Sequence, residues 1–466
     1  MLPTSSGRAT HLRTLTPSLP YAKHSRPMSR TSPKAQTGRA KVSENGIGEA
    51  PDFGFRIRLE ARKPAVSKNR LVHCIRPETG VRYQSPREVK RTLLREEVLA
   101  VNRRNFLQSG SVVSATLAFA KAGRLFSEVT ALDRWRTFQV TTRVEVLKTS
   151  GTTRIWVPAA LISETPFQKT LANTFTCEGG TAKIVESKTD VLGIIAAEFP
   201  AGVRPILTVT SRIATKDCAV DLTVRGTAPK ESRVELEHFL RPTKFLPTDG
   251  IVKATASEIT KGTNSDVEKA RAIYEWIVEN TFRNPKTRGC GAGDIRFMLE
   301  SRDLGGKCAD LNALYVGLAR AAGLPARDVY GIRVAKSEMG YKSLGASSEK
   351  VTKAQHCRAE VYLGDYGWVP VDPADVRKVV LEEPPGNRPL EDDMVEKARA
   401  RLFGSWEMNW MAYNFAHDVA LPGSNGAPVA FFMYPQAETA DGRLDSLDPD
   451  NFKYEITSTE TTSTNG

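Results

Sequence analysis

Three residues in the second half of the chain have the types and the placement that covalent catalysis needs. Cys308 follows two glycines and opens a segment whose apolar residues recur at helical spacing, so we expect it in the first turn of a helix. Unpaired N–H groups and the positive end of the helix dipole there favour a thiolate over a thiol. His356 begins the first strand of a predicted hairpin and Asp372 lies near the end of the second, so the two lie opposite each other to within a few residues. A helix-start Cys with a strand His and an Asp suits a nucleophile, a base and an orienting carboxylate.

Local patterns predict the elements that must position these residues. The nucleophile helix ends at Gly323-Leu324-Pro325, and an earlier helix opens on the capping box Ser265-x-x-Glu268 and stops near residues 284–285. The hairpin turns at residues 364–367, and its odd-numbered positions from Ala359 to Val371 are expected to face the core. Upstream, runs such as 141–146, 154–158 and 206–213 alternate as strands and predict an all-β, sandwich-like domain.

The motifs around the three residues resemble the core of the transglutaminase-like superfamily. The resemblance is carried by residues 288–291, 305–310, 319–327, 356–362 and 367–373, and it is specific over residues 265–376. It implies an α+β, papain-like fold in which the nucleophile helix packs on an antiparallel sheet. It also implies that Cys308 is the nucleophile, His356 the base and Asp372 the third catalytic member. Members transfer acyl groups from amides through a cysteine thioester, which an amine or water resolves. No cofactor or metal is expected. The chain lacks an obvious acidic calcium loop and the C-terminal barrels of animal transglutaminases, which argues against calcium activation and protein crosslinking.

The basic charge of the chain lies in its N-terminal segment. Residues 1–100 carry 20 Lys+Arg and 8 Asp+Glu, whereas residues 101–466 carry 46 and 45. The near-neutral remainder argues against nucleic-acid binding by the folded part. Ser, Thr, Pro and Arg interrupt every short apolar run in residues 1–100, which predicts a disordered basic leader. No stretch approaches the roughly 20 apolar residues of a membrane span.

Residues 101–122 resemble a twin-arginine export signal. Arg103-Arg104 and Phe106-Leu107 precede a mildly apolar run, and small-residue cleavage sites follow at 118–122. The prediction is export to the periplasm or beyond by the twin-arginine machinery, with residues 1–100 an over-extended start or a long leader. An organellar transit peptide is the alternative. The domain plan is then a β-rich domain at 123–245 and a catalytic domain at 246–466, joined by a Pro-rich linker.

The six cysteines show no zinc-site spacing. Export removes Cys74 and leaves an odd number, which predicts one free thiol, and we expect this to be Cys308. Cys290 with Cys357, and Cys177 with Cys218, either form disulfides or are small buried residues. His417-Asp418 resembles a metal-phosphohydrolase dipeptide, but no further histidines gather around it, which favours a structural polar pair.

These observations favour an exported cysteine amidohydrolase or acyltransferase that acts on amide bonds of peptides or proteins, with cell-envelope peptides as candidate substrates. Hydrolysis is favoured over crosslinking because water is abundant and no amine site is visible. The alternative is a non-catalytic envelope binding or scaffold protein that retains the fold. Arylamine acetyl transfer uses the same triad but requires a coenzyme A site that the sequence does not show.

Overall fold

The computed structural model describes residues 134–226, 228 and 230–461. The basic leader, the twin-arginine segment and the predicted cleavage sites lie outside these residues and remain predictions. No helix within the described ranges combines the length and the apolar character needed to cross a bilayer.

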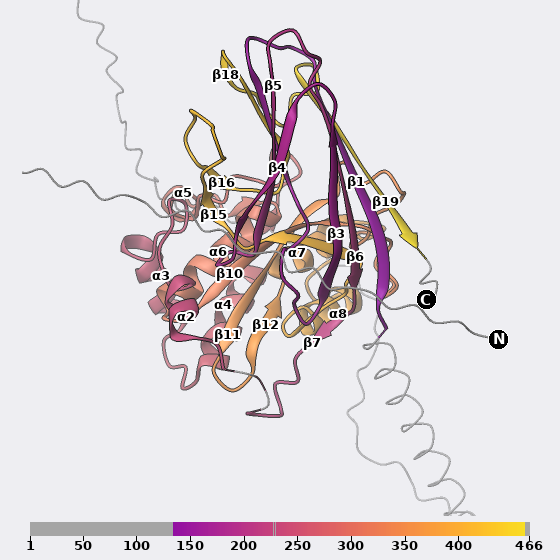
Figure 1. The fold of residues 1–466 in the computed structure, drawn as a ribbon. Coiled ribbons are helices and arrows are strands. Elements are labelled where there is room, and N and C mark those ends of the chain that lie inside the picture. The colour runs from indigo at the N-terminus through magenta and orange to yellow at the C-terminus, as the bar shows by residue number, and fades with distance from the viewer. Residues whose placement is uncertain (1–133, 227, 229, 462–466) are drawn as a thin grey trace, which may run out of the picture. The chain divides into compact units, whose positions relative to one another are not determined.

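Two antiparallel sheets form the β-rich part of the molecule (Figure 1). One has the strand order β19-β1-β6-β3 and the other β18-β17-β2-β5-β4. Their strands are β1 (Arg136–Val146), β2 (Thr153–Pro158), β3 (Gln168–Cys177), β4 (Thr181–Ser187), β5 (Leu192–Phe199), β6 (Ile206–Thr215), β17 (Gln436–Thr439), β18 (Gly442–Arg443) and β19 (Phe452–Thr461). Apolar side chains of both sheets, including Val144, Ile155, Ile195 and Val209, share one buried core, as in a sandwich. Strands from both ends of the described chain therefore build this part, since β17 to β19 come from residues 436–461.

The second part is a sheet with helices, as the α+β prediction requires. The sheet order is β12-β11-β10-β14, and all its pairs are antiparallel. Its strands are β10 (Ala326–Arg333), β11 (Gln355–Leu363), β12 (Gly367–Val371) and β14 (Trp410–Asn414). The helices are α2 (Arg233–His238), α3 (Gly250–Ile259), α4 (Asp266–Asn280), α5 (Ile295–Ser301), α6 (Cys308–Ala321), α7 (Pro373–Glu382) and α8 (Asp393–Arg401). The short strands are β7 (Cys218–Ala219), β8 (Phe282–Arg283), β9 (Gly305–Gly306), β13 (Ser405–Trp406), β15 (His417–Val419) and β16 (Val429–Phe431).

Helix α6 is the central element of this part. It contacts β10 and β11 of the sheet and also α3, α4 and α7. All of its residues are buried, including the ones opposite the apolar stripe that the sequence shows. An amphipathic pattern predicted one buried face, whereas packing from several sides buries the whole helix.

The hairpin of β11 and β12 follows the predicted register. Leu363 pairs with Gly367 and Ala359 with Val371. Both faces of β11 are buried from His356 to Leu363, which differs from the expected one-sided core. The reason is that α6 covers one face, while residues of even number meet a second core that contains Trp406 and Trp410.

Candidate active site

Cys308 is the first residue of α6, and its side chain is 3% exposed. The preceding strand β9 pairs in parallel with β8, so the chain that leads into the cysteine is held in place. Cys308 and His356 both line a cavity of about 700 Å³. The helix start therefore presents its thiol to a partly open cavity of the size that small ligands occupy.

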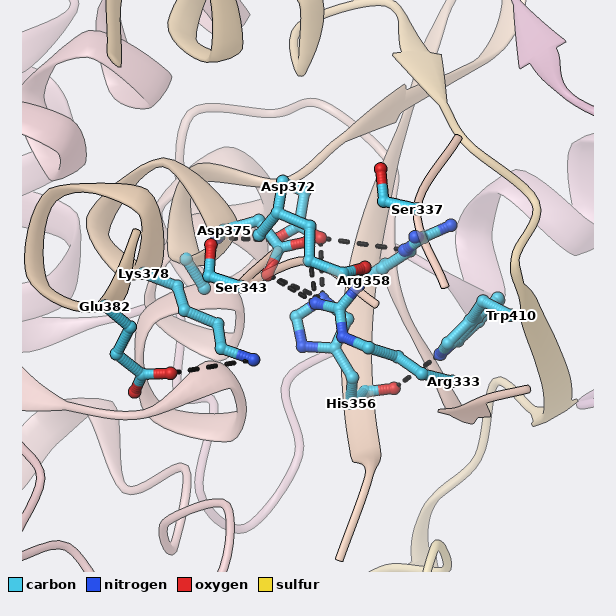
Figure 2. A network of polar contacts seen from close by, with 12 residues as sticks. Arg333, Ser337, Ser343, His356, Arg358, Asp372, Asp375, Lys378, Glu382 and Trp410 are labelled. Atoms are coloured by element: carbon cyan, nitrogen blue, oxygen red, sulfur yellow. Dashed lines mark hydrogen bonds and ion pairs between the residues drawn. The ribbon is translucent and has the colours of Figure 1, made fainter. Parts of the chain in front are cut away.

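His356 and Asp372 come together as the hairpin predicts. Nε2 of His356 lies 2.7 Å from Oδ2 of Asp372, and both side chains are buried (Figure 2). Asp372 follows β12 and caps α7, because its Oδ1 accepts a hydrogen bond from the Asp375 N–H at 3.0 Å. Since Nε2 of His356 is engaged by Asp372, Nδ1 is the ring nitrogen left for Cys308. The structure thus brings all three predicted residues into one constellation, while their catalytic roles remain a proposal.

Asp375 is a second carboxylate beside the imidazole, and sequence reasoning missed it. Its Oδ1 lies 3.4 Å from Nε2 of His356, as Figure 2 shows. Arg333, at the end of β10, donates to Asp375 at 2.6 and 2.8 Å. Arg358 also faces this group, with its Nε 3.7 Å from Asp372. Two buried arginines thus balance two buried carboxylates around one histidine.

The pKa shifts of the cysteine and the histidine have opposite signs. Hydrogen bonding from Cys290, then from Cys357, holds the pKa of the Cys308 thiol well below its usual range, with His356 adding to the effect against the cost of burial. Burial by itself lowers the pKa of His356, but the nearby charge of Asp375, together with Asp372, outweighs it and raises that pKa. The environment therefore favours a thiolate facing an imidazolium, which is the reactive state of a cysteine nucleophile.

Two further thiols, those of Cys290 and Cys357, lie beside Cys308. Among the described residues, Cys177, Cys218, Cys290, Cys308 and Cys357 are all free thiols. Of the two alternatives that the sequence left open for each pair, the structure forms no disulfide in either, and Cys290 and Cys357 each adjoin Cys308. The pKa of Cys290 is raised, first by its hydrogen bond with Cys308, and burial raises that of Cys357. Both therefore stay protonated beside the Cys308 sulfur, and the Cys290 S–H also has an acceptor in the Gln355 carbonyl oxygen at 3.4 Å.

Asp310 fixes the loop that precedes the nucleophile helix. It accepts backbone hydrogen bonds from Ala292 and Gly293 at 2.9 and 3.0 Å, and from Lys307 at 3.0 Å. Gly291 has φ +104°, and a Cβ there would lie 1.9 Å from Asp310 Oδ2. Glycine is thus needed at position 291 for the carboxylate to approach the loop.

The remaining sequence candidates lie apart from this constellation. His417, on β15, lies 3.1 Å from Asp328 of the inner strand β10, so it contacts an acid that is not part of the constellation. Within the described residues, the one group spaced to hold a metal is formed by His356, Asp372 and Asp375. Arg333 and Arg358 already supply positive charge to both carboxylates, which disfavours a cation at this place.

Comparison with known proteins places the same residues in a family. The family model for the transglutaminase-like superfamily matches residues 253–373, which include Cys308, His356 and Asp372. An uncharacterized protein of Haemophilus influenzae is 37% identical over 325 residues, or 66% of this chain and 86% of the relative. Among solved structures, a proposed cysteine protease from Cytophaga hutchinsonii is 17% identical, covers 70% of this chain and 99% of its own, and has a TM-score of 0.40. The periplasmic domain of TgpA from Pseudomonas aeruginosa is 15% identical, covers 50% and 90%, and has a TM-score of 0.26.

Proposed function

The chain belongs to the transglutaminase-like superfamily, and we propose that it is a cysteine-dependent amidohydrolase or acyltransferase that acts through a thioester on Cys308. The observation that carries the proposal is the buried His356–Asp372 pair beside a thiol whose pKa is lowered, at the wall of a cavity. Strongly shifted pKa values in a cavity are typical of catalytic groups, and this combination is the one that acyl transfer by a cysteine requires.

The proposed reaction has two half-reactions. The Cys308 thiolate attacks the carbonyl carbon of the amide, and the imidazolium of His356 gives its proton to the departing amine as the C–N bond breaks. The Cys308 N–H, in the first helical turn, is free of an intrahelical acceptor and suits the developing oxyanion. In the second half-reaction His356 takes a proton from water, the oxygen attacks the thioester, and the thiolate leaves. An amine in place of water gives transfer, but hydrolysis is favoured because the cleft is open to water.

Asp372 has two tasks in this scheme. Its Oδ2 orients the imidazole and stabilises the imidazolium, as the carboxylate of a triad does. Its Oδ1 caps α7 and also accepts from Asn312 of α6 at 3.1 Å. The carboxylate is therefore held from both sides, which limits the rotation of the imidazole.

Export by the twin-arginine route to the periplasm is part of the same proposal. It is supported by Arg103-Arg104, Phe106-Leu107 and the small-residue sites at 118–122. Cell-envelope peptides and proteins are then the substrates within reach.

An acyl-enzyme trap tests the proposed chemistry. The full-length mature chain is mixed with a pool of envelope peptides, quenched in acid, and measured by intact mass. We expect an added mass of one acyl group on the wild-type chain and none on Cys308→Ala, with Cys177→Ala as the matched control that keeps the adduct. Absence of the adduct, together with slow iodoacetamide labelling of Cys308, favours the non-catalytic scaffold instead.

A further inference from the structure

The cavity that holds Cys308 has a one-sided charge. Eight lysine and arginine side chains line it, and none of the described residues in its wall is an aspartate or a glutamate. Residues 101–466 together are close to neutral, so this concentration of cations is a property of the cavity rather than of the composition of the folded part.

Some of these cations already have partners behind the wall. Five of them are paired with four carboxylates, in the contacts Arg283–Glu382, Lys378–Glu382, Arg288–Asp445, Arg333–Asp375 and Lys350–Glu455. The other three are Lys307, Lys353 and Lys453, and no carboxylate among the described residues forms an ion pair with them. Lys307 precedes Cys308, Lys353 precedes the strand of His356, and Lys453 lies on β19. Three separate segments thus bring cations without an ion-paired carboxylate to the wall of the cavity that holds Cys308.

Two of the paired cations, Arg333 and Lys378, are largely buried in the wall. Arg333 is fully enclosed near His356, and the largely buried Lys378 lies close enough to feel its charge. Burial, and then the charge of Arg333, lowers the pKa of Lys378 to about 8. Gathering like charges in a partly enclosed space is unfavourable in the empty protein, and an anion in the cleft relieves it.

We propose that this cleft selects acidic peptides, in which a carboxylate lies within one or two residues of the amide that Cys308 attacks. The inference rests on the proposed function and adds the substrate class to it. A cavity of about 700 Å³ admits a short peptide segment, within the usual range of roughly 300–1,000 Å³ for ligand pockets. The nucleophile requires an amide, and an acidic peptide is the anion that carries one.

A pair of alkylating reagents measures the charge of the cleft without any turnover. Iodoacetate and iodoacetamide both alkylate the Cys308 thiolate with loss of iodide, but only iodoacetate is an anion. We expect the iodoacetate-to-iodoacetamide rate ratio at Cys308 to exceed the ratio for 2-mercaptoethanol by about tenfold or more. The excess disappears as salt rises from 0.01 to 1 M, because the Debye length falls from about 30 to about 3 Å.

Lysine variants test the named residues. Lys353→Gln and Lys453→Gln should each lower the rate ratio, by about twofold at water-like screening, because each removes one unit of positive charge from the wall of the cavity. Lys353→Arg and Lys453→Arg keep the charge and should keep the ratio, which separates charge from fold. A ratio equal to that of 2-mercaptoethanol, or one that neither salt nor the Gln variants change, overturns the proposal.

Protection of Cys308 by defined peptides identifies the class of anion. The tetrapeptide Ala-Glu-Ala-Glu should slow iodoacetamide labelling at concentrations where Ala-Gln-Ala-Gln does not, and the protection should weaken in Lys353→Gln. Equal protection by both peptides, or protection by a short oligonucleotide alone, contradicts the assignment. If the acidic peptide protects but no peptide yields an acyl-enzyme, the substrate class stands as a binding preference and the proposed catalysis fails. An acyl-enzyme that forms equally from acidic and neutral peptides supports the proposed catalysis and contradicts the selection of acidic peptides.

Discussion

Asn312 connects the nucleophile helix α6 to the carboxylate of Asp372, which follows the hairpin of β11 and β12. Its Nδ2 donates to Asp372 Oδ1 at 3.1 Å and to the Cys357 carbonyl oxygen at 2.8 Å. Asn312 is four residues after Cys308, so both lie on one face of α6. One helical turn thus sets the distance between the thiol and the residue that holds His356. The fold positions the triad through this turn and the tight hairpin.

Substitutions of Cys308, His356 and Asp372 should show that these three residues act as one catalytic unit. Cys308→Ala should abolish turnover, and His356→Ala should be nearly as damaging because it removes both the base and the acid. Asp372→Asn should cost up to about 10⁴ in kcat, the size known for a serine triad. Asparagine also caps helices, so this variant should retain α7. The effects should not add, because the three residues act together.

Activity at matched circular dichroism and melting temperature is the decisive comparison for these variants. A folded Cys308→Ala protein that keeps its activity contradicts the nucleophile assignment and favours the scaffold alternative.

A plot of kcat/KM against pH should be bell-shaped, with its acid limb at lower pH and its basic limb at higher pH than an ordinary thiol and imidazole would give. The lowered pKa of Cys308 places the acid limb below the usual range of a thiol, because the thiolate persists there. The raised pKa of His356 places the basic limb above the ordinary value of about 6.5, because the imidazolium that protonates the amine is lost only there. The two limbs belong to the coupled pair. Asp372→Asn should move the basic limb down, since Asp372 raises the pKa of His356, whereas an unmoved limb contradicts this account.

Local signals explain what the sequence predicted. Glycines before Cys308 and the Gly-Leu-Pro stop mark α6, and the short turn at 364–367 fixes the hairpin register and hence the His356–Asp372 pairing. The resemblance to the family pointed to the same three residues. These predictions needed no knowledge of distant contacts.

Long-range packing explains what the sequence could not show. The pairing of β19 with β1 joins the two ends of the described chain, and no local pattern sets such a register. Asn312 and Asp310 are polar residues on a helix whose burial comes from packing on several sides. Asp375 had one available signal, an acid three residues after Asp372 in a first helical turn, but its partner Arg333 comes from another strand.

Removal of a neighbouring thiol should weaken the Cys308 thiolate. Cys290→Ala deletes the hydrogen bond that does most to lower the pKa of Cys308, so that pKa should rise. Cys357→Ala should act in the same direction and to a smaller extent. The measurement is the pH midpoint of iodoacetamide labelling at Cys308, followed by mass spectrometry. Cys177→Ala, on β3, is the control. An unchanged midpoint in Cys290→Ala means that the helix start and His356 alone activate the thiol.

Export should depend on the paired arginines. Replacement of Arg103 and Arg104 by Lys should leave precursor in the cytoplasm, whereas the wild-type mature chain should begin near residues 121–123. Fractionation with N-terminal sequencing measures both. The paired change Arg91→Lys and Arg95→Lys, in the leader, is the matched control that should leave export intact. Unaltered export of the Arg103/Arg104 variant rules out the twin-arginine route.

Asp375→Asn should destabilise the fold and shift the chemistry of His356. Burial alone would raise the pKa of Asp375, but the charges of Arg333 and then His356 outweigh it and hold it well below its usual range. Breaking one partner of such a buried pair costs about 3–5 kcal/mol, because the Arg333 charge is left without its anion. Asp445→Asn, which breaks the exposed pair with Arg288, is the control and should cost less than about 1 kcal/mol.

The pH dependence of this loss has a definite sign. A carboxyl whose folded pKa is lowered contributes its stability above the unfolded pKa of about 3.9 and loses it as the pH falls toward the folded pKa. The difference in the free energy of unfolding between wild type and Asp375→Asn should therefore shrink below about pH 4. It should also be smaller above the folded pKa of His356 than below it, because the stability from a raised histidine pKa is lost as the pH rises through that pKa, and Asp375 raises it. Urea unfolding at several pH values measures this difference.

The basic limb of kcat/KM should also move down in Asp375→Asn, because Asp375 is the charge that raises the pKa of His356 most. If Asp375→Asn loses stability while the basic limb of kcat/KM does not move, Asp375 serves the stability of the fold and does not tune His356.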